Sequence, residues 1–235
     1  DPNELVADLK NMGPAFIKLG QLLSTRPDLL PEPYLLALAQ LQDDVGTSCT
    51  LQQINEIIEE DFGLGAASLF AYFNPEPLAT ASIGQVHEAT LPDGQKVIVK
   101  IRKPGIKKQL TDDVKVLENL SEKAENYSSR FKRMAVHQFI SEFKCLLFAE
   151  LDYEKERQNL IVLKENLGEF KYLTVPVVFE DYCSQRVLTM EFIEGKKITE
   201  LTESEKNAPH VKDIVEDFIK GYLKQIITDG FVHLD

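Results

Sequence analysis

Small residues that could approach a phosphate group, and a lysine that could bind one, lie close together within residues 78–105. The loop consists of Ala79, Thr80, Ala81, Ser82, Ile83 and Gly84. Small side chains let backbone N–H groups come close to a ligand phosphate. Lys100 follows among β-branched apolar residues, where a buried ammonium is costly unless it is paired. The alternative is a lysine at a sheet edge that buries only its aliphatic stem. The small-residue loop before Lys100 favours a lysine that binds phosphate.

The elements that must position this lysine are short strands joined by turns. Residues 78–105 are expected to form a strand, the small-residue loop, a second strand, a tight turn and a third strand. Pro92-Asp93-Gly94 has the composition of the turn. Alternation along the third strand places Val97 and Ile101 on one face and Lys100 on the other.

An acidic cluster that could pair with a lysine lies in a helical run predicted over residues 136–168, as one long helix or as two. Its members are Glu150, Asp152, Glu154 and Glu156. Such a cluster is usually a solvated helix face. Asp152 and Glu156 are one turn apart, whereas Glu150 and Asp152 are about 200° apart on an ideal helix. We therefore expect these acids to serve one site only if the helix is irregular near Glu150.

Near the start of the chain, Lys18 and Gln21 lie three residues apart on a helix that Gly13-Pro14 is expected to begin. This spacing makes them neighbours on one face of the helix. Apolar residues of the same helix recur at helical spacing and form a separate stripe. The simpler interpretation is a solvent-facing lysine in an accessory helical bundle over residues 1–75.

The chain ends in a His-x-Asp sequence, His233-Leu234-Asp235, after an amphipathic helix predicted over residues 209–229. Strands are predicted over residues 175–179 and 186–192. The order of phosphate loop, strand lysine, acidic helix, strands and His-x-Asp is that of a protein kinase. In a kinase the strand lysine binds nucleotide phosphates, a helix glutamate holds the lysine, and the aspartate accepts the proton of the attacking hydroxyl.

Composition narrows the class of partner. The 235 residues carry a net charge of -12, which argues against a nucleic-acid partner. The three cysteines form no C-x-x-C pair and the four histidines have no metal-site spacing, so no metal site is predicted. No signal peptide is recognisable, and no apolar run approaches the ~20 residues that span a bilayer. The chain starts without methionine, and we expect it to be a fragment.

Several motifs make the sequence resemble the UbiB/ADCK family of atypical kinases over essentially its whole length. Residues 18–21, Lys-Leu-Gly-Gln, match the K-x-G-Q motif of that family. Residues 79–87 match its alanine-rich loop, which replaces the usual glycine-rich loop. Residues 150–152, Glu-Leu-Asp, match its E-x-D motif, and Lys100 stands for the lysine of V-A-I-K.

The resemblance implies an α+β, protein-kinase-like fold in three parts. Residues 1–75 would be a helical extension that carries the K-x-G-Q motif over the active site. Residues 76–195 would be a kinase-like N-lobe with an antiparallel sheet and inserted helices. Residues 196–235 would begin a helical C-lobe and end at the catalytic loop.

The resemblance also implies a site for ATP or ADP with Mg²⁺. Lys100 would bind phosphates and pair with Glu156, and Asp235 would be the catalytic-loop aspartate. The other residues expected near the nucleotide are the loop Ala79 to Gly84, Lys18, Gln21, Glu150 and Asp152, with Glu191 and Ile193 in the hinge that meets adenine. Thr80 interrupts the alanine run, which could alter nucleotide preference. The asparagine and the D-F-G-type aspartate that hold magnesium in kinases lie outside these residues, so we expect the segment alone to be inactive in ATP hydrolysis.

The expected function is that of an atypical kinase-like ATP-binding protein, an ATPase or a phosphotransferase for a small-molecule or lipid-linked acceptor, supporting ubiquinone or isoprenoid-quinone biosynthesis. A nucleotide-binding pseudokinase that is a scaffold for quinone-synthesis enzymes is the alternative. A small-molecule kinase of the aminoglycoside or choline type would lack the K-x-G-Q helix. The resemblance implies quinone precursor lipids and quinone-biosynthesis proteins as partners, with peripheral membrane contact. It places the protein in the cytoplasm, at the inner membrane of a bacterium, or in a eukaryotic organelle.

Overall fold

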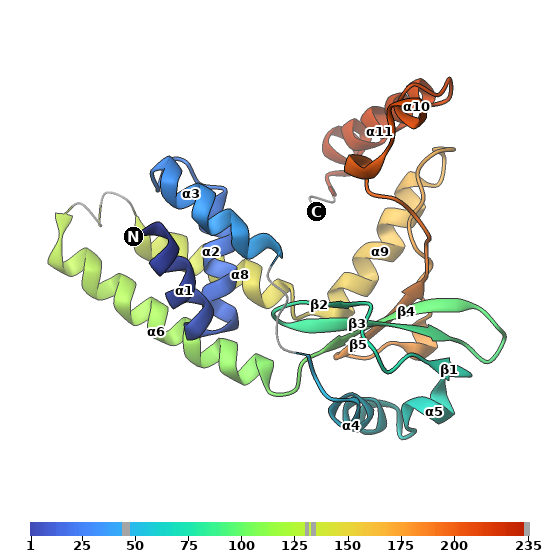
Figure 1. The fold of residues 1–235 in the computed structure, drawn as a ribbon, viewed down its shortest axis with the longest axis horizontal. Coiled ribbons are helices and arrows are strands. Elements are labelled where there is room, and N and C mark those ends of the chain that lie inside the picture. Colours follow the sequence, from blue (N-terminus) through green and yellow to red (C-terminus); the bar gives the residue numbers. More distant parts are fainter. Residues whose placement is uncertain (44–47, 130–131, 133–134, 233–235) are drawn as a thin grey trace.

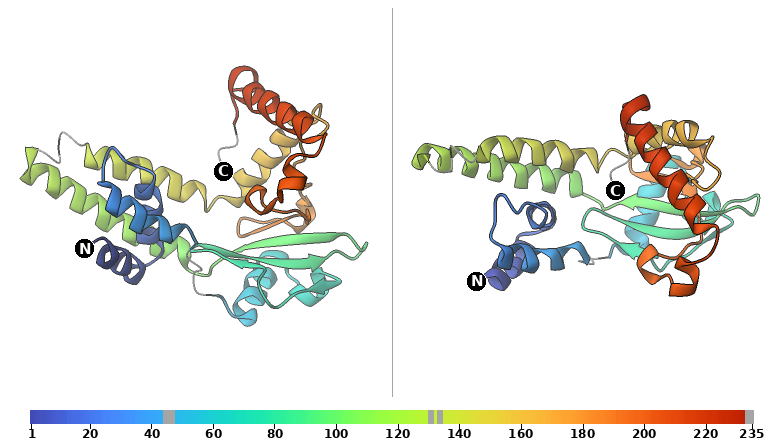
Figure 2. Two further views of the ribbon diagram at one scale, coloured as in Figure 1. Left: turned by 45° about the horizontal axis from the view of Figure 1, so that its top comes forward. Right: turned by 90° about the horizontal axis from the view of Figure 1, so that it is seen from above.

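The computed structural model describes residues 1–43, 48–129, 132 and 135–232. A group of helices lies at one side and an antiparallel sheet with its own helices at the other (Figures 1 and 2). The fold class predicted from the sequence, α+β with an antiparallel sheet, is confirmed.

The helical group brings together two distant parts of the chain. Its elements are α1 (Pro2–Met12), α2 (Pro14–Ser24), α3 (Glu32–Ala39), η1 (Gln40–Asp43), α6 (Ile106–Tyr127) and α8 (Val136–Ala149). Ala15 and Leu19 of α2 share one buried core with Leu110 of α6 and Phe143 of α8. The apolar stripe of α2 therefore packs on α6 and α8, and this packing fixes the face that carries Lys18.

The sheet has the strand order β1-β3-β4-β5, with the short strand β2 also paired to β3. The strands are β1 (Tyr72–Phe73), β2 (Ala79–Thr80), β3 (Gly84–Thr90), β4 (Lys96–Arg102) and β5 (Val187–Glu191). Lys100 of β4 is in register with Val86 of β3 and Leu188 of β5, so it stands at the middle of the sheet. The sequence prediction of strand, loop, strand, turn and strand for this region is confirmed.

The two faces of the sheet are covered by different elements. Val97 and Ile101 are fully buried in a core with residues of α4 (Leu51–Phe62) and α5 (Ala66–Leu69). Thr50 and Gln53 form the predicted capping box at the start of α4. The opposite face, which carries Lys100, is crossed by α9 (Tyr153–Leu167) (Figure 1). The alternation of β4 thus gives the lysine a face separate from the apolar core.

The strand predicted over residues 175–179 is wrong. Only Val178 forms a bridge, to Met190 of β5. Pro176 has no N–H group to donate, and the N–H of Val177 donates to the Glu191 carboxylate, 3.1 Å away, instead of to a backbone carbonyl. The ladder therefore ends after one bridge. The short helix η2 (Glu180–Tyr182) follows.

The helix predicted over residues 209–229 is present as α11 (Val211–Lys224), which continues into a π-helical turn, η4 (Gln225–Asp229). The predicted polar connection before it contains η3 (Ile198–Glu200) and α10 (Glu203–Lys206). Large apolar residues of α11 are exposed, including Phe218 and Ile219. None of the described helices is both long and apolar enough to span a membrane.

Candidate functional site

Lys100 and Glu156 form the ion pair at the centre of the site. The Lys100 Nζ lies 2.9 Å from both carboxylate oxygens of Glu156, and each side chain is 32% exposed. The same Nζ lies 5.0 Å from the centre of the Tyr153 ring, which is the range of a cation–π contact. The predicted pairing of strand lysine and helix glutamate is therefore present, and the lysine is oriented by two groups of α9.

Tyr153 was not predicted from the sequence as a site residue. It is almost completely buried, and this burial raises the pKa of its phenol. A Cβ atom added to Gly84 would lie 2.7 Å from the Tyr153 hydroxyl and 2.9 Å from the Ile101 carbonyl oxygen. Tyr153 precedes Glu156 by three residues, so both project from one helix face toward β3 and β4. This spacing is the signal in the sequence that could have identified it.

The alanine-rich loop is held on one side by Lys103, a second residue that the sequence prediction missed. Its Nζ donates to the carbonyls of Ala81 (2.6 Å) and Ser82 (3.3 Å). Its backbone N–H donates to the carbonyl of Ile83 (3.0 Å). Burial lowers the pKa of the Lys103 ammonium. Because C=O and N–H point in opposite directions across a trans peptide, the N–H groups of Ser82 and Ile83 point away from Lys103.

The remaining loop residues complete a tight turn. Ala79 and Thr80 form β2, and the N–H of Ala81 donates to the carbonyl of Gly84 at 2.8 Å. Ser82 Oγ is buried and has no hydrogen-bond partner among the described residues, and the same holds for the Tyr153 hydroxyl. Buried polar atoms usually have a partner, so two such atoms at one loop and its neighbouring helix are consistent with a polar ligand.

The E-x-D residues lie at the break between the two helices that make up the run predicted over residues 136–168. Helix α8 ends at Ala149, and the Asp152 carboxylate caps α9 by accepting from the N–H of Lys155 (3.0 Å). Glu150 is separate from this cap and pairs with Lys18. Arg102 donates to the carbonyl of Leu151 at 2.9 Å, which ties β4 to the break. The helix is thus irregular at Glu150, and the two acids make different contacts.

Lys18 and Gln21 of the K-x-G-Q motif contact different parts of the chain. Lys18 Nζ lies 2.7 Å from the Glu150 carboxylate, so α2 is joined to the α8–α9 break. Gln21 instead donates to the carbonyl of Leu41 at 2.7 Å, and its own carbonyl accepts from the Gln42 amide. Gln21 therefore links η1 to α2, whereas Lys18 links α2 to the break between α8 and α9.

The predicted hinge follows β5. The Glu191 carboxylate and backbone N–H both bond to the backbone of Val177, so the side chain of Glu191 is used to hold this segment. The Phe192 N–H donates to the Lys96 carbonyl at 3.3 Å. Ile193 is partly exposed beyond the strand end. Asp235 lies outside the described residues.

Three classes of group could contact a nucleotide in this arrangement. They are the Lys100 ammonium, the N–H groups of the alanine-rich loop, and the backbone beyond β5. The unpartnered Ser82 hydroxyl and the close approach at Gly84 fit a phosphate-bearing group. Among the residues described, no cluster of three or more His, Cys, Asp or Glu could hold a metal ion, so no residue is assigned to Mg²⁺.

Residues 40–235 match the model of the ABC1 atypical kinase-like domain. Over 227 residues the chain is 37% identical to "Probable protein kinase UbiB" of Marinobacter nauticus, covering 97% of this chain and 41% of that protein. It is 38% identical over 233 residues to "Protein ACTIVITY OF BC1 COMPLEX KINASE 3, chloroplastic" of Arabidopsis thaliana, covering 99% of this chain and 32% of that protein.

A solved structure supports the same relationship. The Rv3197–erythromycin complex from Mycobacterium tuberculosis matches with a TM-score of 0.52 and 28% identity, over 77% of this chain and 45% of that one. The chain spans less than half the length of the relatives named here. The family model covers most of the chain, and the resemblance to UbiB-type atypical kinases predicted from the motifs is confirmed. The chain belongs to the ABC1 atypical kinase-like family.

Proposed function

We propose that the chain binds ATP or ADP between the alanine-rich loop and Lys100, as part of an atypical kinase or ATPase that supports ubiquinone or isoprenoid-quinone biosynthesis. The observation that carries the proposal is the ion pair of Lys100 with both carboxylate oxygens of Glu156, beside a loop of small residues. A lysine held in this way is the phosphate-binding element of kinases.

The roles of the other groups follow from their positions. The N–H groups of Ser82 and Ile83 would donate to phosphate oxygens, and Lys100 would bind the same phosphates as a positive charge. The backbone of Glu191 and Ile193 would meet the adenine. Bound Mg²⁺ would neutralise phosphate charge. Asp235 would accept the proton of the attacking hydroxyl.

The position of Lys18 supports a phosphoryl acceptor other than a protein. Its ion pair with Glu150 places α2 against the helix break that adjoins the Lys100 face of the sheet. We propose that Lys18, Gln21, Glu150 and Asp152 line the site on the side where a protein substrate would approach. The acceptor would then be a small or lipid-linked molecule, or water. The three-part division into residues 1–75, 76–195 and 196–235 belongs to the same proposal.

Quinone precursor lipids, quinone-biosynthesis proteins and a peripheral membrane contact are the proposed partners. The names of the UbiB relatives motivate the link to ubiquinone, and the chloroplastic relative motivates an organelle as one location. A cytoplasmic location at the inner membrane is the corresponding proposal for a bacterial protein.

Nucleotide titration of the intact protein tests the binding site. Lys100→Ala should weaken ATP affinity about tenfold or more, because a charge-assisted hydrogen bond contributes roughly 1.5–3 kcal/mol. Glu156→Gln should weaken it less, since the lysine remains. Lys96→Ala, an exposed lysine on the same strand, is the matched control and should leave affinity unchanged. Equal affinity of Lys100→Ala and wild type would refute the proposed site.

Single-turnover ATP hydrolysis separates an enzyme from a pseudokinase scaffold. If the protein is an ATPase or kinase, substitution of Lys100 or of Asp235 should abolish turnover in the intact protein. A scaffold would bind nucleotide through Lys100 without turnover that depends on either residue. Residues 1–235, purified on their own, should show no Mg²⁺-dependent turnover.

A further inference from the structure

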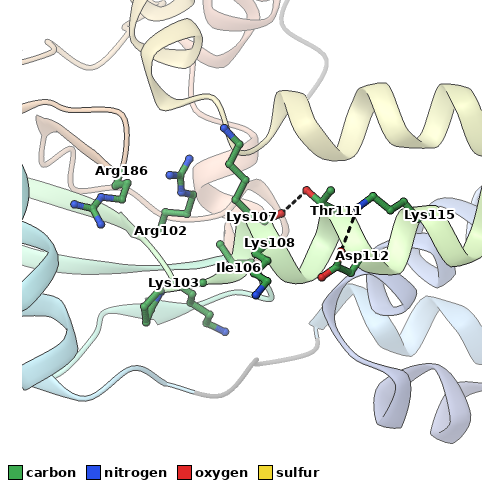
Figure 3. Close-up of a pocket in the computed structure, with 11 residues that line it drawn as sticks. Arg102, Lys103, Ile106, Lys107, Lys108, Thr111, Asp112, Lys115 and Arg186 are labelled. Carbon is green, nitrogen blue, oxygen red and sulfur yellow. Dashed lines mark hydrogen bonds and ion pairs between the residues drawn. The ribbon is translucent and has the colours of Figure 1, made fainter.

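A basic cavity of about 610 Å³ lies where β4 leads into α6, and neither Lys100 nor Glu156 lines it (Figure 3). Six cationic residues line it: Arg102, Lys103, Lys107, Lys108, Lys115 and Arg186. Asp112 is its single acidic lining residue. This local concentration of positive charge contrasts with the net charge of the chain, which is -12.

Two of the six cations are already neutralised by carboxylates. Arg186 bonds to Asp61 and to Glu60, and Lys115 lies 3.3 Å from Asp112. The other four, Arg102, Lys103, Lys107 and Lys108, have no carboxylate partner among the described residues. The cavity therefore has four cationic groups that form no direct ion pair among the described residues, although Asp61 and Asp152 lie near enough to Arg102 to favour its charge.

Two of these four are held by backbone carbonyls only. Arg102 donates to the carbonyl of Leu151, and Lys103 donates to carbonyls of the alanine-rich loop. Burial lowers the pKa of the Arg102 guanidinium, and Arg186 adds to this shift, while Tyr153, Asp61 and Asp152 oppose it. Neutral carbonyls orient these groups but leave their charge, and charged groups near one another at a partly buried surface favour a bound anion.

The backbone at the cavity adds to the same effect. Gly105 precedes α6 with a φ of 70°, and no side chain caps this helix start. The helix is 22 residues long, and the positive end of its dipole opens on the cavity. The charge, the hydrogen-bond donors and the helix end are all complementary to a phosphate group.

We propose that this cavity binds a phosphate-class anion, either a free multiply charged phosphate or the headgroup of an anionic phospholipid. Figure 3 shows Arg102 and Lys107 extending to one side of the turn, and Lys103 and Lys108 to the other. A ligand with more than one charged group can contact both sides, which a single small anion cannot. The cavity is lined by neither Lys100 nor Glu156, and it adjoins the proposed nucleotide site through Lys103, which also holds the alanine-rich loop.

Titration with inorganic pyrophosphate tests the free-anion source in the intact protein. The double variant Lys107→Ala/Lys108→Ala removes two exposed lysines and should weaken binding about tenfold or more. The double variant Lys123→Ala/Lys212→Ala removes the same charge elsewhere on the surface and should bind as wild type does. Lys100→Ala should remove pyrophosphate binding at the nucleotide site only, so the loss caused by Lys107→Ala/Lys108→Ala should persist when Lys100 is also replaced.

Vesicle binding tests the lipid source with the same variants. Vesicles containing phosphatidylglycerol are compared with vesicles of phosphatidylcholine alone. If Lys107→Ala/Lys108→Ala binds anionic vesicles more weakly than wild type but binds pyrophosphate equally well, the ligand is a lipid headgroup. If the variant loses affinity for pyrophosphate alone, the ligand is a free phosphate. If the cavity variant and the surface control behave alike toward both probes, or if Lys100→Ala alone abolishes pyrophosphate binding, the proposal is wrong.

Discussion

The Lys103 ammonium lies 2.6 Å from the Ala81 carbonyl oxygen, so a lysine from the end of β4 holds the alanine-rich loop from behind. Its second bond to the Ser82 carbonyl and the backbone bond to Ile83 keep consecutive carbonyls on one side. The loop N–H groups are thereby presented on the other side. Lys103 is a positioning residue in the proposed nucleotide site, because it acts through the loop.

Replacing this lysine tests that role. Lys103→Met should weaken ATP affinity roughly fivefold to tenfold, because two loop carbonyls lose a charged donor and the N–H groups are no longer held in place. Lys103→Arg keeps a charged donor and should retain most of the affinity. Nucleotide titration with each variant, and with Lys96→Met as a control, measures the effect. Wild-type affinity in Lys103→Met would show that the loop holds its shape without the lysine.

Gly84 should tolerate no side chain. In Gly84→Ala the new methyl group would meet the Tyr153 hydroxyl and the Ile101 carbonyl oxygen, and the second of these belongs to the backbone. We expect a loss of about 1–3 kcal/mol in the free energy of unfolding, measured by urea denaturation. Gly195→Ala is the control, since nothing lies within 4 Å of a Cβ atom there. A stability equal to that of the control would mean that β3 shifts without cost.

The contact between Lys18 and Glu150 can be measured by a double-mutant cycle. Both side chains are partly exposed, at 23% and 44%, so solvent screens their attraction. Lys18→Met and Glu150→Gln should show a coupling of about 0.5–1 kcal/mol that decreases as salt is added. The cycle of Lys18→Met with Asp152→Asn is the matched control and should show no coupling, because Asp152 caps α9. Equal coupling energies in the two cycles would mean that Lys18 interacts with Glu150 and Asp152 alike.

His87 should make stability depend on pH. Its ring is fully buried, with Nδ1 2.9 Å from the Asn74 carbonyl oxygen and Nε2 2.7 Å from the Gln85 amide nitrogen. The carbonyl requires a proton on Nδ1, and Nε2 then accepts from the amide. Burial lowers the pKa of His87 below its ordinary value of 6.5, although the Asn74 carbonyl and Glu76 oppose this shift.

The sign of the effect follows from that lowered pKa. Below pH 6.5 the imidazole of His87 binds a proton more readily in the unfolded chain than in the folded one. The contribution of His87 to the free energy of unfolding is therefore fully present above this pH and decreases as the pH falls. The slope attributable to His87 is at most about 1.4 kcal/mol per pH unit. Urea denaturation from about pH 7.5 to 5.5 measures it. His87→Gln should have a flatter profile than wild type, and identical profiles would exclude His87 as the titrating group.

Features that depend on neighbouring residues could be predicted from the sequence. The capping box of Thr50 and Gln53, the helix start at Pro14 and the alternation around Lys100 are local, and the structure has all three. The pairing of Lys100 with Glu156 was predicted through the family motif and not from spacing, because 56 residues separate the two.

Features that depend on contacts between distant segments were missed. Lys103 belongs to no recognisable local pattern, and Tyr153 has only its three-residue spacing from Glu156, so their roles become clear only when the loop, β4 and α9 meet. The start of helix α6 at Ile106 is a further example, since Ile106 and Leu110 are buried only because the helix packs on α2 and α8. The Val178 segment has the composition of a strand, and a hydropathy pattern does not reveal that the Glu191 carboxylate accepts from the Val177 N–H.

The shared core of α2, α6 and α8 has a consequence for how this protein could be controlled. Ala15 and Leu19 are buried against Leu110 and Phe143, so the segment that carries Lys18 is part of the folding unit. Proteolytic removal of the first helices would expose this apolar core and is expected to promote aggregation. A separation of Lys18 from Glu150 that keeps this core packed would be a change of side-chain partners in the intact chain.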